Sequence, residues 1–282
     1  MSSRARALLR LAPFRHVITD APVSYSVYSA FSFYGARRGG ELPGTWLVAA
    51  LGALGHETPA VRQTLYRMEA SKELESRTEG RGKFYRLSPA ARAEAAAGLA
   101  KIMEDDDAAA WDGQWTLVQF RAGTETQVER ERLREVLRAE GFALAGPGLY
   151  LHPRDRSTRL LDAARGHGVR DMLEVFRATR VDNSNGDFVS RHWNLDETAA
   201  RYDAFLSRYT PLARSSGALA NEASFVLRFA VVFDYLEAAW QDPELPVELL
   251  PARWPGGGAR RLARALYKRL LPGALAFGDS LQ

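Results

Sequence analysis

Four side chains able to contact nucleic acid lie within a short stretch of the chain: Arg62, Gln63, Tyr66 and Arg67. Positions three and four apart share one face of a helix, so Gln63, Tyr66 and Arg67 are expected to share an exposed face, with Arg62 beside it. Arginine forms bidentate bonds with guanine, and glutamine does so with adenine. The chemistry offered is recognition of a DNA duplex, and the alternative is a surface helix whose charges are simply solvated.

The helix that must position these side chains is expected to begin at Thr58. Threonine is a good N-cap, and Pro59 fits the first helical position because its missing N–H would be unsatisfied there anyway. Val61, Leu65 and Met68 then recur at helical spacing and predict the buried face.

A basic hairpin follows this helix. Gly80 and Gly82 suit a turn that needs positive φ. Arg81 lies between them, with Lys83 and Arg86 close by. The tip is therefore expected to carry dense positive charge that can lie against phosphate.

These segments together predict a winged helix-turn-helix. An apolar helix covers residues 47–54, a break covers 55–59, and the hairpin ends at Leu87. An earlier aromatic helix is expected over 25–34, with 37–40 as a loop. In this motif the second helix lies in the major groove of duplex DNA.

Positive charge is concentrated at the start of the chain. The 282 residues have a net charge of +4, whereas residues 1–87 contain 13 Lys/Arg and 7 Asp/Glu, a balance of +6 that leaves −2 for the rest. A basic module on a near-neutral body is typical of a DNA-binding head on a regulatory body. Arg4, Arg6, Arg10 and Arg15 predict an arm that could add phosphate contacts.

The composition predicts a cytoplasmic protein without a membrane segment, metal or cofactor. No apolar span reaches 18 residues, and no signal peptide is apparent. The absence of cysteine excludes disulfides and cysteine zinc sites and fits a reducing compartment. The five histidines are isolated from one another, and the acidic run 104–107 is expected to be a solvated linker.

Residues 111–190 are predicted to form a second, ferredoxin-like domain, because strands and helices follow in the order strand–helix–strand–strand–helix–strand. The strands are expected over 115–120, 142–144, 149–151 and 173–178, and the helices over 125–140 and 158–167.

The first of these helices should be amphipathic. Val128, Leu133, Val136 and Leu137 are expected to point inward, and Gly141 is expected to end the helix in the C′ position.

The last part of the chain, residues 191–282, is predicted to be helical. Arg228 stands within a strongly apolar stretch and should be paired, because a buried lone charge is costly. A structural ion pair with a nearby carboxylate is the favoured interpretation, and a clamp for an anionic effector is the alternative. The helices are expected over 196–209 (N-capped by Asp196), 218–240 and 258–271.

The predicted fold class is therefore α+β, with a helix over 89–103 connecting its first two domains. The expected parts are a winged-helix domain (1–88), a connecting helix with an acidic linker (89–110), a ferredoxin-like middle domain (111–190) and a helical C-terminal domain (191–282).

Ordered local motifs run through nearly the whole chain. They are Val61-Arg62-Gln63-Thr64-Leu65 with Arg67, Gly80-Arg81 with Phe84-Tyr85-Arg86-Leu87, Trp111-Asp112-Gly113-Gln114-Trp115, Gly141-Phe142, Gly146-Pro147-Gly148-Leu149-Tyr150, Trp193-Asn194-Leu195, Asp242-Pro243-Glu244-Leu245-Pro246, Leu249-Leu250-Pro251 and Trp254-Pro255-Gly256. In these motifs the chain resembles the PaaX-type repressors, which control phenylacetate catabolism.

This resemblance implies a homodimeric repressor bound to double-stranded operator DNA. It also implies that the DNA affinity falls when an aryl-acetyl coenzyme A thioester, such as phenylacetyl-CoA, binds. The residue pattern and the resemblance together predict effector contact by Arg228 and DNA contact by Arg62, Gln63, Tyr66, Arg67, Lys72, Arg81 and Lys83.

The resemblance further implies that the middle domain is similar in fold to the small endonuclease of CRISPR adaptation. That enzyme uses an acidic residue at the end of its first strand, where this chain has Gln119-Phe120-Arg121. No nuclease activity is therefore expected. The alternative functions are nucleic-acid processing through the middle domain and acyl-CoA chemistry, but no GxSxG motif, cysteine or paired histidine predicts an enzyme.

Two departures from the family pattern stand out. Lys72 and Glu73 occupy positions where the family usually has Gly-Trp, so the path into the hairpin should differ and Lys72 could add a phosphate contact. Phe233 and Leu236 stand where the family tends to have a histidine and a second arginine. If those positions serve the effector, the ligand or its affinity differs here.

Overall fold

The computed structural model describes residues 14–103, 110–121, 126–181 and 185–281, and the chain divides into two compact units. The first unit contains residues 1–105, 202–239 and 256–282, and the second contains 106–201 and 240–255. Helices and antiparallel sheets occur in both, which confirms the α+β class. The predicted arm residues Arg4, Arg6 and Arg10, the side chain of Arg15 and the acidic run 104–107 lie outside the described residues.

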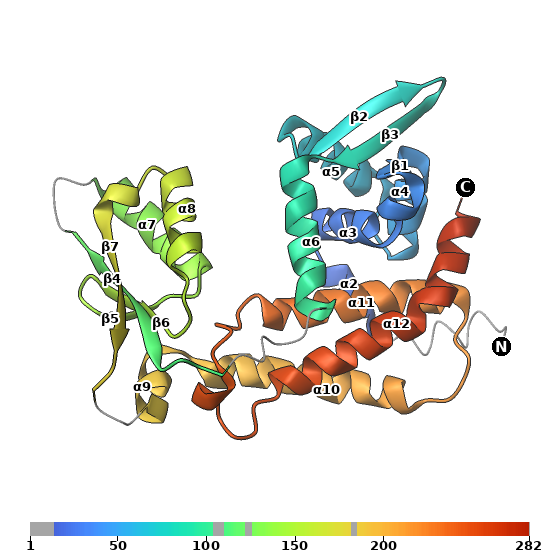
Figure 1. The fold of residues 1–282 in the computed structure, drawn as a ribbon. Coiled ribbons are helices and arrows are strands. Elements are labelled where there is room, and N and C mark those ends of the chain that lie inside the picture. The colour runs from blue at the N-terminus through green and yellow to red at the C-terminus, as the bar shows by residue number, and fades with distance from the viewer. Residues whose placement is uncertain (1–13, 104–109, 122–125, 182–184, 282) are drawn as a thin grey trace. The chain divides into compact units, whose positions relative to one another are not determined.

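Part of the first unit, here called the head, consists of three α-helices, two short helical turns and a small sheet. Its strands pair antiparallel in the order β1-β3-β2, and the β2–β3 ribbon extends beyond the helices (Figure 1). This is the arrangement that the sequence predicted as a winged helix-turn-helix. The elements are α3 (Val23–Ala30), a π-helical turn (Phe31–Gly35), a 3-10 turn (Ala36–Arg38), β1 (Glu41–Pro43), α4 (Gly44–Ala53), α5 (Thr58–Ala70), β2 (Leu74–Glu79) and β3 (Gly82–Leu87).

Apolar spacing accounts for the packing of the head. Val61, Leu65 and Met68 of α5 are at most 3% exposed, as their helical spacing predicted. Trp46 and Leu51 of α4 are equally buried. The three-residue strand β1 was not predicted, because a segment so short carries no periodicity of its own.

Longer helices complete the first unit, and two of them pass through a proline. The helix predicted to end at Tyr209 continues through Pro211, and the helix predicted to end at 271 continues through Pro272. A proline removes one helical hydrogen bond, and packing along the rest of the helix can outweigh that loss. The helices are α2 (Arg15–Asp20), α6 (Pro89–Met103), the second half of α10 (Leu195–Arg214), α11 (Asn221–Ala239) and α12 (Gly256–Ser280).

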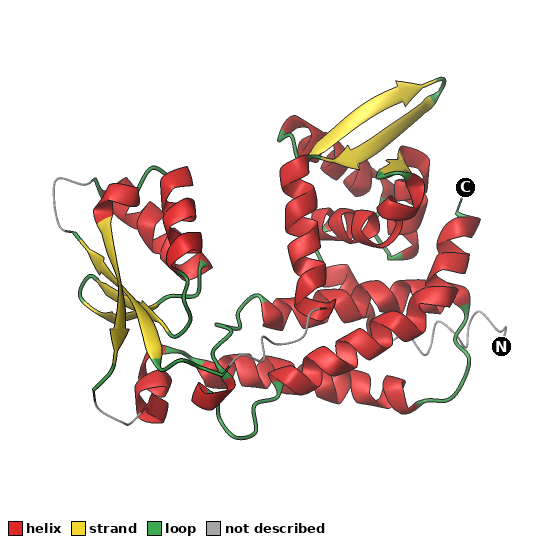
Figure 2. Cartoon of the chain, in the orientation of Figure 1, coloured by secondary structure: helices red, strands yellow, loops and turns green. Residues whose placement is uncertain are grey.

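The second unit is built on a four-stranded antiparallel sheet in the order β5-β6-β4-β7, with α7 and α8 on one face (Figure 2). This is the strand order of a ferredoxin-like βαββαβ arrangement. Its elements are β4 (Gln114–Phe120), α7 (Gln127–Ala139), β5 (Ala143–Gly146), β6 (Leu149–His152), α8 (Ser157–Gly166), a 3-10 turn (Arg170–Met172) and β7 (Leu173–Thr179).

Two apolar clusters hold this sheet. Val118 of β4 packs with α7 and α8 on one face of the sheet. Trp115 of the same strand packs with Trp193 and Leu245 on the opposite face. A short helix, α9 (Asn185–His192), joins the second cluster and was not predicted.

One prediction for α7 is wrong. Leu133, Val136 and Leu137 are buried, but Val128 is 65% exposed. Five helical positions separate Val128 from Leu133, which turns their side chains to nearly opposite sides. Gly141 ends α7 with φ +79°, as expected of a C′ glycine.

Candidate nucleic-acid interface

The exposed face of α5 carries the four side chains that the sequence singled out. Arg62, Gln63, Tyr66 and Arg67 are all exposed, Tyr66 to 72%. Arg67 Nη2 donates to Thr64 Oγ1 over 3.2 Å. Within the described part of the chain, neither arginine has a carboxylate partner. Both guanidinium groups are therefore available to an external anion.

The start of α5 differs from the prediction by one residue. Glu57 is the N-cap and makes no side-chain capping bond, so Thr58 is the first helical residue and Pro59 the second. The missing N–H of proline costs no more at this second position than at the first, because no N–H of the first turn has a helical acceptor. Gly55, with φ +100°, turns the chain between α4 and α5, and His56 N donates to Leu51 O over 3.1 Å.

Lys72 occupies the sharp corner between α5 and the β2–β3 hairpin, here called the wing. Its φ is +63°, a left-handed conformation that favours glycine. Glu73 N donates to Met68 O (2.9 Å) and Lys72 N to Glu69 O (3.1 Å), the two bonds of a Schellman ending. The Lys72 side chain is exposed, so this corner places an ammonium group at the end of the recognition face.

Glu73 stabilises the same corner through hydrogen bonds. Its carboxylate accepts from Tyr28 Oη over 2.9 Å and from Ser71 Oγ over 2.6 Å. Burial and the Glu73 carboxylate raise the pKa of Tyr28, which keeps this phenol protonated and donating. Glu73 thus links the corner to α3 through the Tyr28 hydroxyl.

The tip of the wing is a two-residue turn, Gly80-Arg81. Gly80 has φ +58°, as expected. Gly82, by contrast, lies within β3 and has no positive φ, so its predicted role in the turn is wrong. A Cβ at Gly82 would lie 3.1 Å from Phe84 Cε2, so this glycine makes room for a ring. Arg81 itself is exposed.

The predicted density of free charge at the tip is wrong, because carboxylates neutralise most of the basic side chains of the wing. Lys83 Nζ lies 2.7 Å from Glu69 Oε2, and Arg86 Nη2 lies 2.6 Å from Glu75 Oε2. Arg77 is paired with Glu41 and Glu79. Among the wing residues, all of which are described, Arg81 is the cation without a carboxylate partner.

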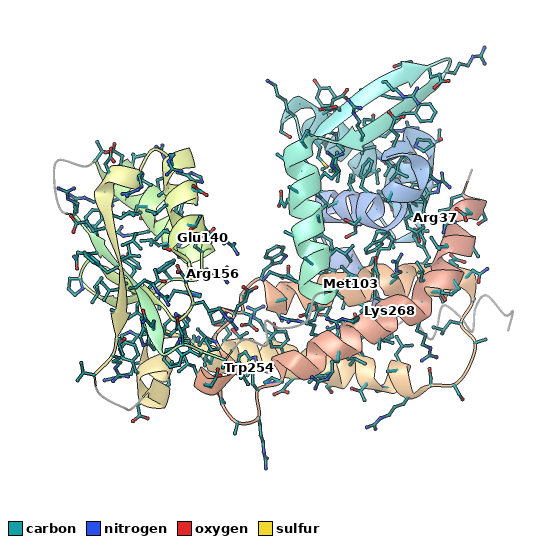
Figure 3. All side chains as sticks on the ribbon, in the orientation of Figure 1. Arg37, Met103, Glu140, Arg156, Trp254 and Lys268 are labelled. Atoms are coloured by element: carbon teal, nitrogen blue, oxygen red, sulfur yellow. The ribbon has the colours of Figure 1, made fainter. Side chains whose placement is uncertain are left out.

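The last turns of α12 hold the head from beneath. Tyr34 Oη donates to Ala274 O over 3.0 Å, and Trp46 Nε1 donates to Gly278 O over 2.7 Å. Arg37, labelled in Figure 3, has Nη2 3.9 Å from an Asp279 carboxylate oxygen. A Cβ at Gly278 would lie 2.7 Å from Tyr34 Cε1, so only glycine fits without movement.

Arg228 lies where the head, α11 and α12 meet. It is 2% exposed, and its guanidinium carbon lies 4.5 Å from the ring centroid of Phe33 and 3.9 Å from that of Tyr267. Nε and Nη1 have no hydrogen-bond partner among the described residues. Burial lowers the pKa of this guanidinium. The favoured prediction of an ion pair with a carboxylate is therefore wrong, and two aromatic faces take its place.

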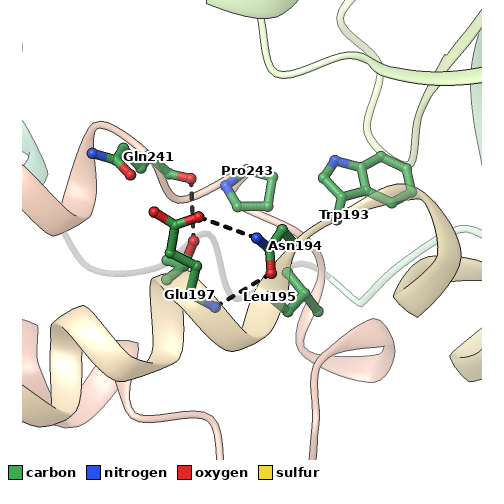
Figure 4. Close-up of a pocket in the computed structure, with 7 residues that line it drawn as sticks. Trp193, Asn194, Leu195, Glu197, Gln241 and Pro243 are labelled. Carbon is green, nitrogen blue, oxygen red and sulfur yellow. Dashed lines mark hydrogen bonds between the residues drawn. The ribbon is translucent and has the colours of Figure 1, made fainter.

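A small cavity of about 170 Å³ lies in the second unit, at the start of α10 (Figure 4). Asn194 Nδ2 donates to Glu197 Oε2 over 3.1 Å, and Glu197 N donates to Asn194 Oδ1 over 3.4 Å. Asn194 therefore caps α10, and Asp196, predicted as the N-cap, lies in its first turn. These polar groups satisfy one another. The lining residues are Trp193, Asn194, Leu195, Glu197, Thr198, Gln241 and Pro243.

The end of β4 offers no metal-binding carboxylate of its own. Gln119, Phe120 and Arg121 stand there, and Arg121 Nε lies 3.6 Å from Glu174 Oε1. Across the described ranges, no group of three or more His, Cys, Asp or Glu side chains could hold a metal ion.

The described helices are also too short or too polar to span a membrane.

Sequence reasoning missed the residues that position the interface. Glu69 links α5 to the wing, and Tyr34 and Trp46 link the head to α12. Their partners lie 7 to 240 residues away in the sequence. The one available signal was Glu69 itself, an acidic residue on an otherwise basic helix face.

Comparison with known proteins gives a consistent assignment over most of the chain. Residues 24–91 match the family described as PaaX-like protein, 108–189 the PaaX protein central Cas2-like domain, and 193–280 the PaaX-like protein C-terminal domain. Transcriptional repressor PaaX of Escherichia coli (strain K12) is 30% identical over 277 residues, covering 93% of this chain and 85% of that protein.

A solved structure shares the fold. Uncharacterized protein Rv0674 from Mycobacterium tuberculosis superposes with a TM-score of 0.54 at 24% identity, covering 84% of this chain and 90% of that one. The ordered matches along the sequence, together with the identity to the Escherichia coli repressor, show that this chain belongs to the PaaX family of transcriptional repressors, which are regulators and not enzymes.

Proposed function

We propose that this protein represses genes of phenylacetate catabolism by binding double-stranded operator DNA in the cytoplasm, and that an aryl-acetyl-CoA releases it. One observation carries the DNA-binding part. Four cations that have no carboxylate partner among the described residues, Arg62, Arg67, Lys72 and Arg81, follow one another along α5, the corner and the wing tip. Such a surface attracts phosphates and releases counterions when it binds them.

Base recognition falls to the middle of this surface. Gln63 and Arg67 can bond base edges in the major groove, and Tyr66 adds an exposed ring that can contact a thymine methyl group. Lys72 and Arg81 lie beyond the end of α5, at the corner and at the wing tip, where they would contact phosphate and fix the register. Lys83 is also predicted to contact DNA, but it must first leave Glu69.

A mobility-shift titration tests this assignment. The probe is a duplex selected from a random pool with the unmodified protein, and the variants are Arg67→Ala and Arg81→Ala. Removal of a bidentate base contact should cost about 1–3 kcal/mol of binding and relax the specificity at one position. The matched control is Arg165→Ala, an exposed arginine of α8 in the second unit. Undiminished affinity in both head variants contradicts the proposal.

The protein acts as a homodimer in this scheme, with two heads in successive major grooves of a palindromic operator. Their recognition helices would lie about 34 Å apart, one helical turn of DNA. Sedimentation of the protein with the selected duplex measures the stoichiometry. One chain per duplex would refute the dimeric arrangement while leaving the head assignment intact.

The effector part rests on Arg228. A buried guanidinium with unpartnered Nε and Nη1 can accept an anionic group of an acyl-CoA such as phenylacetyl-CoA. Its neighbours Phe33 and Tyr267 belong to the head and to α12, so a ligand there would disturb the contact that holds the head. The effector must bind the DNA-incompetent arrangement more tightly, because equal affinity would shift nothing.

Calorimetry with phenylacetyl-CoA tests the effector part, with Arg228→Met as the variant. Arg228 has no carboxylate partner among the described residues, so replacing it by an apolar side chain of similar volume removes a desolvated charge and leaves no carboxylate unpaired. The variant should therefore stay folded and bind operator, yet lose the heat of effector binding and the release from DNA. Full retention of both responses would exclude Arg228 as the effector contact.

A further inference from the structure

The Glu69 carboxylate joins the recognition helix to both strands of the wing. Glu69 extends from the last turn of α5, and its Oε1 accepts from Ser76 Oγ of β2 over 2.5 Å. Its Oε2 accepts from Lys83 Nζ of β3 over 2.7 Å. Three elements thus meet at one side chain.

The local environment favours this pair. The side chains of Lys83 and Glu69 are 43% and 31% exposed, so solvent screens them only in part. Hydrogen bonds from Lys83 and Ser76 lower the pKa of Glu69, and the bond to Glu69 raises the pKa of Lys83. Lys83 Nζ also lies 5.1 Å from the ring centroid of Tyr85, which is 9% exposed.

At its base the wing is anchored by the buried side chains of Leu74, Tyr85 and Leu87 and by the pairing of β3 with β1, but its outer part has little else to fix its angle to α5. Residues 75–80 of β2 and its turn are all exposed, so no apolar side chain there anchors the ribbon to the helix. Arg77 of β2 is paired with Glu41 of β1, and this ion pair does not involve α5. The distance between Arg81 and the exposed face of α5 therefore depends strongly on Glu69.

We propose that Glu69 and Lys83 are positioning residues that hold the wing at a fixed angle to the recognition helix, so that Arg81 and the face of α5 meet one duplex together. This inference rests on the proposed DNA binding. In this proposal Lys83 stays bonded to Glu69 when the protein binds DNA, as it is in the free protein. The competing arrangement is that Lys83 leaves Glu69 and contacts a phosphate.

A double-mutant cycle in the full-length protein separates these arrangements. Glu69→Gln, Lys83→Gln and the double variant are titrated with the selected duplex at several salt concentrations. If the pair positions the wing, each single variant should bind about tenfold more weakly and the double variant no worse than either. The slope of log affinity against log salt should then stay at its original value.

The competing arrangement predicts the opposite pattern. Glu69→Gln would strengthen binding by freeing Lys83, and Lys83→Gln would lower the salt slope by about 0.9 as one phosphate contact is lost. Either of these results overturns the proposal. Lys83→Arg, which can keep the bond to Glu69, should restore the affinity that Lys83→Gln loses, an effect that loss of folding would not produce.

The wing offers a matched control. Glu75 and Arg86 form an ion pair of similar length, 2.6 Å, but both lie within the hairpin and face each other across β2 and β3. The same cycle on Glu75→Gln and Arg86→Gln should leave operator affinity nearly unchanged, and an equal loss there would overturn the proposal. Failure of the unmodified protein to bind any duplex specifically would instead refute the proposed function.

Discussion

Helix α5 and the wing both carry basic side chains, but most of those on the wing are paired with carboxylates of the protein. On α5, Arg62 and Arg67 have no carboxylate partner among the described residues. On the wing, three of the four cations are paired within the protein, and Arg81 at the tip has no carboxylate partner in the part of the chain that the structure describes. Charges counted along a sequence therefore overstate the charge that a surface offers. In this head α5 therefore offers more unpaired cations than the wing does, because most cations of the wing are bound by carboxylates of the protein.

The largest effect should come from removing both free cations of the helix. Arg62→Ala combined with Arg67→Ala should weaken operator binding at least about 30-fold, since each strong contact is worth about 1–3 kcal/mol. Discrimination against a scrambled duplex should fall as well. The control is Arg77→Ala with Arg86→Ala, two paired cations of the wing. An equal loss in that control would break the comparison between helix and wing.

A substitution in α12 should test the tight contact between this helix and the head. Gly278→Ala places a methyl group 2.7 Å from the buried Tyr34 ring, which should lower the free energy of unfolding by about 1–3 kcal/mol. Urea denaturation measures this. Gly258→Ala is the control on the same helix, because its Cβ would meet Leu206 at an ordinary 3.9 Å. The control should be neutral or stabilising, and similar losses in the two variants would refute the tight contact.

Salt dependence should distinguish two arginines of the wing. Arg81→Ala should lower the slope of log affinity against log salt by about 0.9, whereas Arg86→Ala should leave it nearly unchanged. The reason is that Arg86 is paired with Glu75, whereas no described carboxylate pairs with Arg81. Titrations of both variants between low and physiological salt give the two slopes. Equal slopes would show that ion pairing does not withhold Arg86 from phosphate.

The smallest effect is expected at the corner between the two regions. Lys72→Gly removes a left-handed lysine and should raise the free energy of unfolding by about 0.5–1 kcal/mol. It should also weaken DNA binding slightly and lower the salt slope. Lys72→Ala removes the same charge but keeps the unfavourable φ, so it should not stabilise. If both variants are equally stable, the corner carries no strain.

Sequence periodicity predicted the elements of this protein better than their ends. The apolar spacing of Val61, Leu65 and Met68 placed α5 because burial follows the helical period. The predicted ends of α10 and α12, at 209 and 271, were wrong, because both helices continue through a proline, Pro211 and Pro272 respectively. A short strand such as β1 has no period from which it could be inferred.

The candidate interface was predictable as a set of residue types but not as a set of available groups. Exposure of Gln63 and Arg67 follows from their place on a helix. The pairing of Lys83 with Glu69 does not, because it depends on how the hairpin folds back over α5. The same holds for Arg228, whose aromatic neighbours Phe33 and Tyr267 come from segments far apart in the sequence.

The contact between α12 and the head can also be followed with a label placed at the end of α12. Asp279 lies 3.6 Å from Arg38, whose guanidinium carbon is 5.2 Å from the ring centroid of Trp46, and the neighbouring Ser280 is exposed. The sequence contains no cysteine, so Ser280→Cys would create a unique labelling site. The emission of a fluorophore attached there should change when the head separates from α12.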